Sequence, residues 1–109
     1  MRAYVRGSFF DRGARRQQRR FRRGSSVPTG PGSNSAGLAL FRYRTRCGTM
    51  YGHTGAYGLG GYTQFAAATP SGRRSATLTA NTALVGSSGP ARAFRRVMGR
   101  ALCAALARR

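Results

Sequence analysis

Acidic residues are nearly absent from this sequence, and the shortage limits the partners that it can have. The chain of 109 residues contains one Asp, no Glu and twenty Arg, which gives a formal net charge of +19. Almost no arginine can therefore pair with a carboxylate of the same chain, and the surface must be strongly positive. The expected partner is a polyanion: nucleic acid first, an anionic membrane surface second and an acidic protein third.

Lysine is also absent, so every basic side chain is a guanidinium. A guanidinium binds phosphate through two parallel hydrogen bonds and stacks on bases, which suits nucleic-acid recognition. A GC-rich coding sequence explains the lack of Lys and Ile better. It explains the lack of acids less well, because Asp and Glu codons are available to such a gene.

Residues for catalysis and metal binding are scarce. Two cysteines, Cys47 and Cys103, are too few for a disulfide scaffold and lie outside metal-ligand spacing, so we expect free thiols in a reducing compartment. His53, the only histidine, has no acid near it in the sequence to orient it, since Asp11 is remote. We expect a loop residue or an RNA contact at His53. The chain is therefore expected to be no enzyme and to have no cofactor, metal or small-molecule substrate.

Long apolar runs are missing too, and bulky apolar residues are few. No run approaches the roughly 18 to 20 residues of a membrane-spanning helix. Leu, Ile, Val and Phe make up about 16% of the chain, below the roughly 20% at which a highly charged chain is typically disordered. We expect a small α+β fold with long irregular basic extensions and little independent core. Its elements would be a short β-hairpin or strand pair, a C-terminal amphipathic helix and an N-terminal Arg-rich helix.

An Arg-rich arm occupies residues 1–24, with seven arginines between Arg12 and Arg23. Ser8 followed three residues later by Asp11 predicts a helix start, and Gly24 predicts its end. A solvated basic tail is the alternative for the free protein. The composition is also that of a mitochondrial or plastid transit peptide. One face of the helix would carry Phe10, Ala14, Gln17 and Phe21.

Residues 25–37 are rich in Gly, Pro and Ser and predict a linker to a body formed by residues 38–109. The best strand is Leu38–Cys47, where apolar residues and arginines alternate from Phe41 onward. Its arginines would be about 6.6 Å apart, close to the phosphate spacing of a nucleic-acid strand. We favour phosphate contacts over a merely solvated face for this row, Arg42, Arg44 and Arg46.

The Gly/Tyr-rich segment 48–62 is predicted to be a loop. It lacks the Lys and hydroxyl of a nucleotide-binding P-loop. It can instead follow a nucleic-acid surface while tyrosines stack on bases, or form a flexible loop with lightly packed tyrosines. Residues 73–85 alternate in part and predict a second strand paired with Leu38–Cys47, although their alanine content also allows a helix.

The clearest helix is predicted for residues 90–109, with apolar residues from Phe94 to Leu106 on one stripe. It would pack on the strands or on a neighbouring protein, with an anionic membrane surface as the alternative. The candidate protein contacts on this stripe are Phe94, Val97, Ala101, Leu102 and Leu106.

The candidate RNA contacts are arginines of the arm and the strand, two arginines that open the second strand, and two tyrosines. They are Arg12, Arg15, Arg16, Arg19, Arg20, Arg22, Arg23, Arg42, Arg44, Arg46, Arg73, Arg74, Tyr51 and Tyr57. In composition the whole chain resembles the small basic proteins of ribosomes. Its transit-like and lysine-free character is similar to that of mitochondrial ones.

This resemblance implies a structural rRNA-binding subunit of a ribosome, in mitochondria or alternatively in the cytoplasm or another organelle. Its partners would be rRNA or other structured RNA and neighbouring proteins of a large assembly. Two other functions fit the composition. One is an accessory subunit of an organellar membrane complex, such as a respiratory complex, that binds anionic lipid. The other is a viral or chromatin-like nucleic-acid packaging protein.

Overall fold

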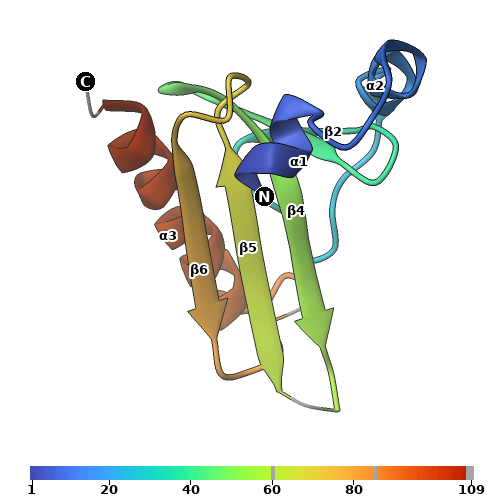
Figure 1. Ribbon diagram of the computed structural model, residues 1–109. Coiled ribbons are helices and arrows are strands. Elements are labelled where there is room, and N and C mark those ends of the chain that lie inside the picture. Colours follow the sequence, from blue (N-terminus) through green and yellow to red (C-terminus); the bar gives the residue numbers. More distant parts are fainter. Residues whose placement is uncertain (60, 85, 108–109) are drawn as a thin grey trace.

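The sheet is organised around one long hairpin. Strand β4 (Gly48–Tyr57) turns back into β5 (Tyr62–Ala68), and the two strands pair antiparallel with Tyr57 opposite Tyr62. The computed structural model describes residues 1–59, 61–84 and 86–107. Strands β4, β5 and β6 run side by side towards one end of the molecule, where the hairpin turns (Figure 1).

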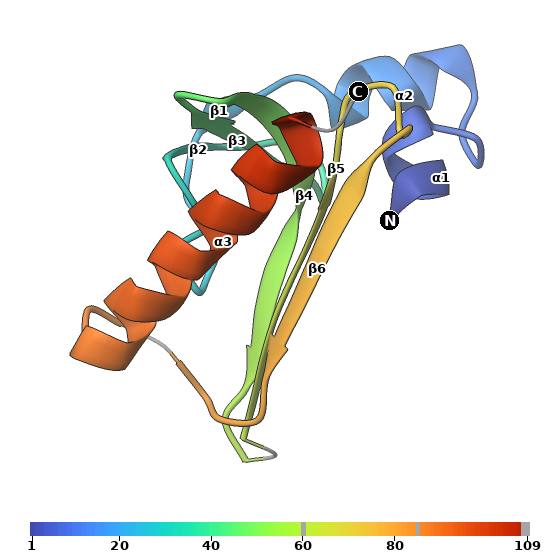
Figure 2. The ribbon, with the colours of Figure 1, turned by 90° about the vertical axis from the view of Figure 1, so that its left-hand side faces the viewer.

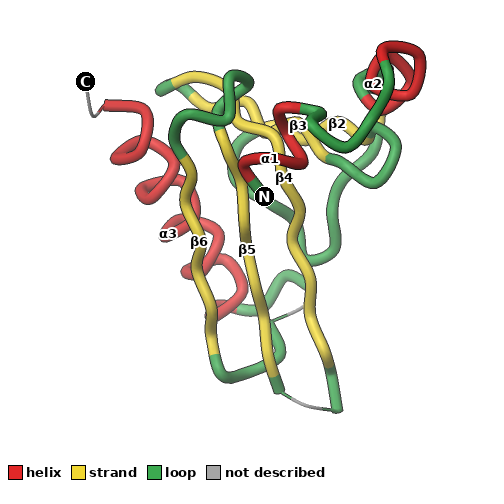
Figure 3. Tube along the Cα trace, viewed as in Figure 1, coloured by secondary structure: helices red, strands yellow, loops and turns green. Residues whose placement is uncertain are grey.

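The described residues form one antiparallel sheet of six strands, in the order β1-β2-β3-β4-β5-β6. Figure 3 shows the strands in yellow, with β4, β5 and β6 side by side. Each strand pairs with its neighbours in the sequence; Asn34, for example, lies opposite Tyr43. Antiparallel neighbours need only short turns, so the chain crosses the sheet from one edge to the other. The remaining strands are β1 (Arg22–Arg23), β2 (Ser33–Ala36), β3 (Phe41–Thr45) and β6 (Ser75–Ala80).

Helix α3 (Gly89–Ala107) covers one face of the sheet (Figure 2). It confirms the helix predicted for residues 90–109 as far as Ala107, and residues 108 and 109 lie outside the described residues. Its apolar stripe is buried against alternate residues of three strands, as the period of two in a strand requires. The main core lies between helix and sheet and consists of Tyr43, Met50, Phe65, Ala67, Met98 and Leu102.

A second, smaller core lies on the opposite face. Consecutive strand residues point to opposite faces, so Ala67 belongs to the main core while Ala68 packs against Val5 and Leu40. Val5 belongs to helix α1 (Arg2–Arg6), which lies on the other side of the sheet from α3 in Figure 2. Helix α2 (Arg12–Gln18) follows α1 and leads into the edge strand β1.

The prediction of little independent core is wrong. The radius of gyration is 13.5 Å, close to the roughly 13 Å of a compact domain of this length. The content of Leu, Ile, Val and Phe underestimates the core, because Tyr, Met and Ala fill much of the interior here. The expected strand pair is instead a six-stranded sheet, and β6 pairs with β5 rather than with β3.

Two segments predicted to lack regular structure contain strands. The predicted loop 48–62 includes β4, in which Gly52 is needed because a side chain there would collide with the backbone of Ala66 and Ala67. The predicted linker 25–37 includes β2 and the buried residue Ser26. The glycines of these segments predict turns, but in the structure Gly30 and Gly52 allow close packing against neighbouring strands.

The helix in the arm is shorter than the predicted one. Asp11, rather than Ser8, is the N-cap of α2, and its side chain accepts a hydrogen bond of 2.7 Å from the backbone N–H of Ala14. The helix ends at Gln18, well before Gly24, and the chain then enters β1. Phe10 and Phe21 therefore lie outside the helix whose face they were expected to share.

The prediction of free thiols is also wrong. Cys47 and Cys103 form a disulfide with a Cα–Cα distance of 5.3 Å across a sequence separation of 56 residues. The bond joins the β3–β4 turn to α3. Among the described residues no helix is long and apolar enough to cross a bilayer, and no cluster of three or more His, Cys, Asp or Glu could hold a metal ion.

Candidate nucleic-acid interface

The arm docks on the sheet through a stack of aromatic and guanidinium groups. Phe21, which follows α2, stacks on Tyr51 of β4 with ring centroids 5.2 Å apart and planes 23° apart. The guanidinium of Arg42 lies 4.7 Å from the Phe21 ring centroid, and that of Arg19 lies 5.2 Å from the Tyr51 ring centroid. Each such cation–π contact stabilises by roughly 0.5 to 1 kcal/mol at partly exposed sites. The arm is therefore a folded part of the protein.

The docking engages three of the predicted RNA contacts. Arg19 donates a hydrogen bond of 2.6 Å to the backbone carbonyl of Val5, which ties α2 to α1. Arg42 donates to the hydroxyl of Ser35 on the neighbouring strand at 3.3 Å. Tyr51 is half-buried, and the Phe21 and Arg19 side chains lie against its ring.

Besides Arg19, the six arginines between Arg12 and Arg23 are exposed: three lie on α2, two on β1, and Arg20 lies between these elements. We call them the arm surface. On β3, Arg44 is also exposed, on the same face as Arg42. The chain's only acid, Asp11, is engaged as the N-cap of α2. The arm surface consists of Arg12, Arg15, Arg16, Arg20, Arg22 and Arg23.

The predicted row of strand arginines is interrupted. Tyr43 is buried and Arg44 is exposed, so the predicted alternation holds along β3. However, β3 ends at Thr45, and Arg46 lies in the β3–β4 turn. The row on β3 therefore consists of Arg42 and Arg44 only. These two are not equivalent, because Arg42 contacts Ser35 and the Phe21 ring.

Arg73 and Arg74 have different environments at the β5–β6 turn. Arg73 is exposed. Arg74 donates hydrogen bonds of 2.6 Å to the carbonyl of Leu106 and 3.5 Å to that of Ala105, in the last turn of α3. A cation there satisfies free carbonyls and opposes the negative end of the helix dipole. Arg74 therefore holds α3 to the sheet.

Tyr57 is exposed but distant in sequence from every arginine. It is 63% exposed on the β4–β5 hairpin, opposite Tyr62, which is 52% exposed. No charged residue occurs between Arg46 and Arg73. The hairpin is therefore an uncharged projection, and the arginines gather on the rest of the molecule.

Most of the predicted protein contacts on α3 are used within the chain. Leu102 is fully buried in the main core, and Phe94 and Leu106 pack against it. Ala101 is partly buried. Val97 is 44% exposed and remains accessible to another protein.

Sequence reasoning missed the arginines of α3 as a group. Arg92, Arg96 and Arg100 are spaced one turn apart and are exposed. Arg92 and Arg96 line one hollow beside Gly32, and Arg96 and Arg100 line a second one, which Arg46 joins from the β3–β4 turn. Their four-residue spacing is visible in the sequence, but their proximity to Arg46 is a tertiary contact that the sequence pattern does not show.

Two other polar residues have structural surroundings. The hydroxyl of Tyr43 donates to Ser26 Oγ at 3.0 Å, and burial raises the pKa of this phenol above its ordinary value of 10.0, although hydrogen bonds to Ser26 and Thr54 oppose the shift. His53 is exposed on β4, with its ring edge-on to that of Phe41 at 5.0 Å between centroids.

No family model matches this chain, and a search of curated proteins finds no significantly similar sequence. Any functional conclusion therefore rests on the chemistry of the surface.

Proposed function

We propose that this protein binds structured RNA through the arm surface, without catalysing a reaction. The observation that carries the proposal is that six exposed arginines on α2, on β1 and between them are held on a folded scaffold and have almost no acid to neutralise them. Guanidinium groups in this setting bind phosphates through charge-assisted hydrogen bonds. The arginines of α2 and β1 supply position and charge rather than base recognition.

Docking of the arm favours this function energetically. A disordered basic tail loses conformational entropy when it binds RNA, and that loss subtracts from affinity. Here Phe21 and Tyr51 already hold α2 and β1 on the sheet before RNA is present. With about six phosphate contacts, affinity should fall by about 10³-fold between 50 and 200 mM salt.

The more specific form of the proposal is a structural rRNA-binding subunit of a ribosomal particle. Its support is the composition, which combines twenty arginines with a single acid. The disulfide bears on the compartment, because disulfides are rare in cytosolic proteins. It therefore disfavours the cytoplasmic ribosome as the assembly.

The proposal is tested by two triple variants with the same change in net charge. Arg12→Gln/Arg16→Gln/Arg20→Gln removes three charges from the arm surface. Gln64→Glu/Thr77→Glu/Thr79→Glu adds three acids at exposed positions on β5 and β6. We expect the first variant to reduce the salt slope of binding to an RNA hairpin by about three, one for each contact.

The second variant should reduce that slope by less than one, because β5 and β6 lie at the opposite edge of the sheet from β1 and their added charges act only through the screened field. Equal losses in the two variants would contradict a specific role of the arm surface. Equal affinity for duplex DNA would instead favour a general packaging function.

A further inference from the structure

A groove beside α3 gathers arginines from two elements that are far apart in the sequence. Its walls are the β3–β4 turn and the exposed side of α3, and its lining includes Gly32, Thr45, Arg46, Arg96, Gly99 and Arg100. Arg96 and Arg100 are one helical turn apart, so their side chains lie on the same side of α3. Arg46 faces them from the turn. We call this feature the α3 groove.

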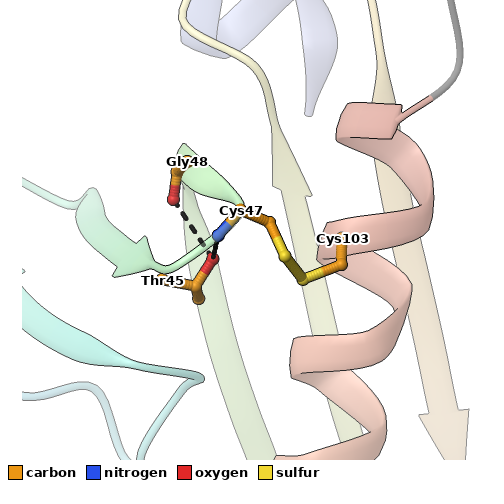
Figure 4. Close-up of a disulfide and its surroundings, with 4 residues drawn as sticks. All are labelled: Thr45, Cys47, Gly48 and Cys103. Atoms are coloured by element: carbon orange, nitrogen blue, oxygen red, sulfur yellow. Dashed lines mark hydrogen bonds between the residues drawn. A yellow bond between two sulfur atoms is a disulfide. The ribbon is translucent and has the colours of Figure 1, made fainter.

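The disulfide holds the two walls together. Cys47 is adjacent to Arg46, and Cys103 is three residues after Arg100, so the Cys47–Cys103 bond fixes the turn against the helix (Figure 4). The turn is further ordered by Thr45, whose hydroxyl donates to the carbonyl of Gly48 and accepts from the backbone N–H of Cys47, both at 3.2 Å.

Arg95 anchors the α3 wall of the groove to the backbone just before β2. It donates a hydrogen bond of 2.8 Å to the carbonyl of Gly30 and one of 2.6 Å to that of Gly32. Arg95 is thereby committed to the backbone and differs from its neighbour Arg96, which faces the groove. Gly99 adds no side chain between Arg96 and Arg100, and the nearest atom to a Cβ placed there is Cβ of Pro31 at 3.8 Å.

Three guanidinium groups in one groove repel each other unless an anion lies among them. Like charges one turn apart destabilise a helix by about 0.2 to 0.5 kcal/mol per pair. The only side-chain carboxylate of the chain, Asp11, is engaged at α2. An anion that relieves this repulsion therefore comes from outside the described part of the chain. A phosphate group fits best, because its several oxygens can accept from more than one guanidinium at once.

We propose that the α3 groove is a phosphate-binding site in which Arg46, Arg96 and Arg100 contact the phosphate oxygens. The site is separate from the arm surface and does not depend on RNA binding there. The phosphate is supplied either by a small phosphorylated molecule or by a nucleic-acid backbone. Both sources share the chemistry that the groove recognises.

The test compares two double variants of the full chain. Arg96→Gln/Arg100→Gln removes two charges from the groove, and Thr77→Glu/Thr79→Glu makes the same change in net charge at exposed positions on β6, outside the groove and the arm surface. Inorganic phosphate is titrated in a chloride background of constant ionic strength, with binding followed by NMR. We expect the dissociation constant for phosphate to rise at least tenfold in the groove variant and less than twofold in the β6 variant.

The same two variants are titrated with an RNA hairpin to identify the source. Loss of phosphate affinity specific to the groove variant supports a small ligand. If only RNA affinity falls more in the groove variant than in the β6 variant, the phosphate belongs to a backbone. Equal effects of both variants on both probes would overturn the site. A failure of RNA binding as such leaves the result with inorganic phosphate intact, so the two proposals fail separately.

Two further variants test how the groove is held. Arg46→Gln removes the contribution of the turn without disturbing the disulfide, and we expect phosphate affinity to fall at least threefold. Cys47→Ser/Cys103→Ser frees the turn and should weaken phosphate binding by a similar factor while far-UV circular dichroism stays unchanged. Wild-type phosphate affinity in Arg46→Gln would contradict the proposed contact. Wild-type affinity in the folded cysteine variant would contradict the positioning role of the disulfide.

Discussion

Removal of the Phe21 side chain should detach the arm from the sheet. In Phe21→Ala the ring that stacks on Tyr51 at 5.2 Å and lies under Arg42 at 4.7 Å is lost. The aromatic pair stabilises by about 0.5 to 1.5 kcal/mol, and the cation–π contact by roughly 0.5 to 1 kcal/mol. A fully buried Phe costs about 3 to 5 kcal/mol when truncated. Since Phe21 is only partly buried, we expect a loss of about 2 kcal/mol in the free energy of unfolding, below the 3 kcal/mol end of that range.

Urea unfolding followed by circular dichroism measures this change. A loss of about 2 kcal/mol corresponds to a fall of about 1 M in the urea midpoint. Limited trypsin digestion provides a local readout, because a detached arm exposes the bonds after Arg20 and Arg22 to cleavage. Faster cleavage there is expected even at low enzyme concentration.

The matched control is Phe9→Ala. Phe9 is 72% exposed, and its truncation should change stability by less than about 0.5 kcal/mol. If Phe21→Ala and Phe9→Ala behave alike in both assays, the stack does not hold the arm, and the arm surface is not preorganised.

Three other substitutions test the remaining structural claims. Asp11→Ala removes the cap that accepts from Ala14 and should lower stability by about 1 kcal/mol, which thermal unfolding measures. Tyr43→Phe tests the raised pKa of the phenol: the wild type should keep its stability below about pH 10 and lose it as pH rises from there towards the folded-state pKa, because the unfolded chain ionises first. In urea unfolding from pH 8 to pH 11, the variant should show a smaller decline, and an identical decline would refute the assignment. Gly52→Ala should destabilise by at least about 1 to 3 kcal/mol through its clash with Ala66 and Ala67, whereas Gly55→Ala, which has open space around it, serves as the control.

Periodicity predicted the elements whose pattern is set locally. The stripe from Phe94 to Leu106 indicates α3 because each buried residue recurs at helical spacing. The alternation around Tyr43 indicates β3 for the corresponding reason in a strand. Neither pattern identifies the partner of an element. For this reason the predicted pairing of residues 73–85 with Leu38–Cys47 is wrong, and β6 pairs with β5 instead.

Tertiary contacts determine the features that the sequence does not predict. Gly52 belongs to a strand because Ala66 and Ala67 approach its backbone, and only the paired hairpin reveals that contact. The disulfide requires Cys47 and Cys103 to meet across 56 residues, which no local spacing encodes. The core was underestimated because the count did not include Tyr and Met.

For the candidate site, the sequence indicated which arginines exist but not which remain available. Arg74 binds the carbonyls at the end of α3, and Arg19 binds the carbonyl of Val5, so both are engaged in the fold. Nothing in their sequence context separates them from Arg16 or Arg20, which are exposed. A guanidinium becomes structural only when a distant backbone carbonyl lies within its reach.

The salt dependence of RNA binding by the wild-type chain tests the central claim most directly. The dissociation constant for a structured RNA hairpin is measured by fluorescence anisotropy between 50 and 200 mM KCl. With about six phosphates neutralised at the arm surface, the logarithm of the association constant, which is the reciprocal of the measured constant, should fall against log salt with a slope of about −4 to −5. A slope near zero, or no binding at 50 mM, would contradict the claim that this surface binds RNA.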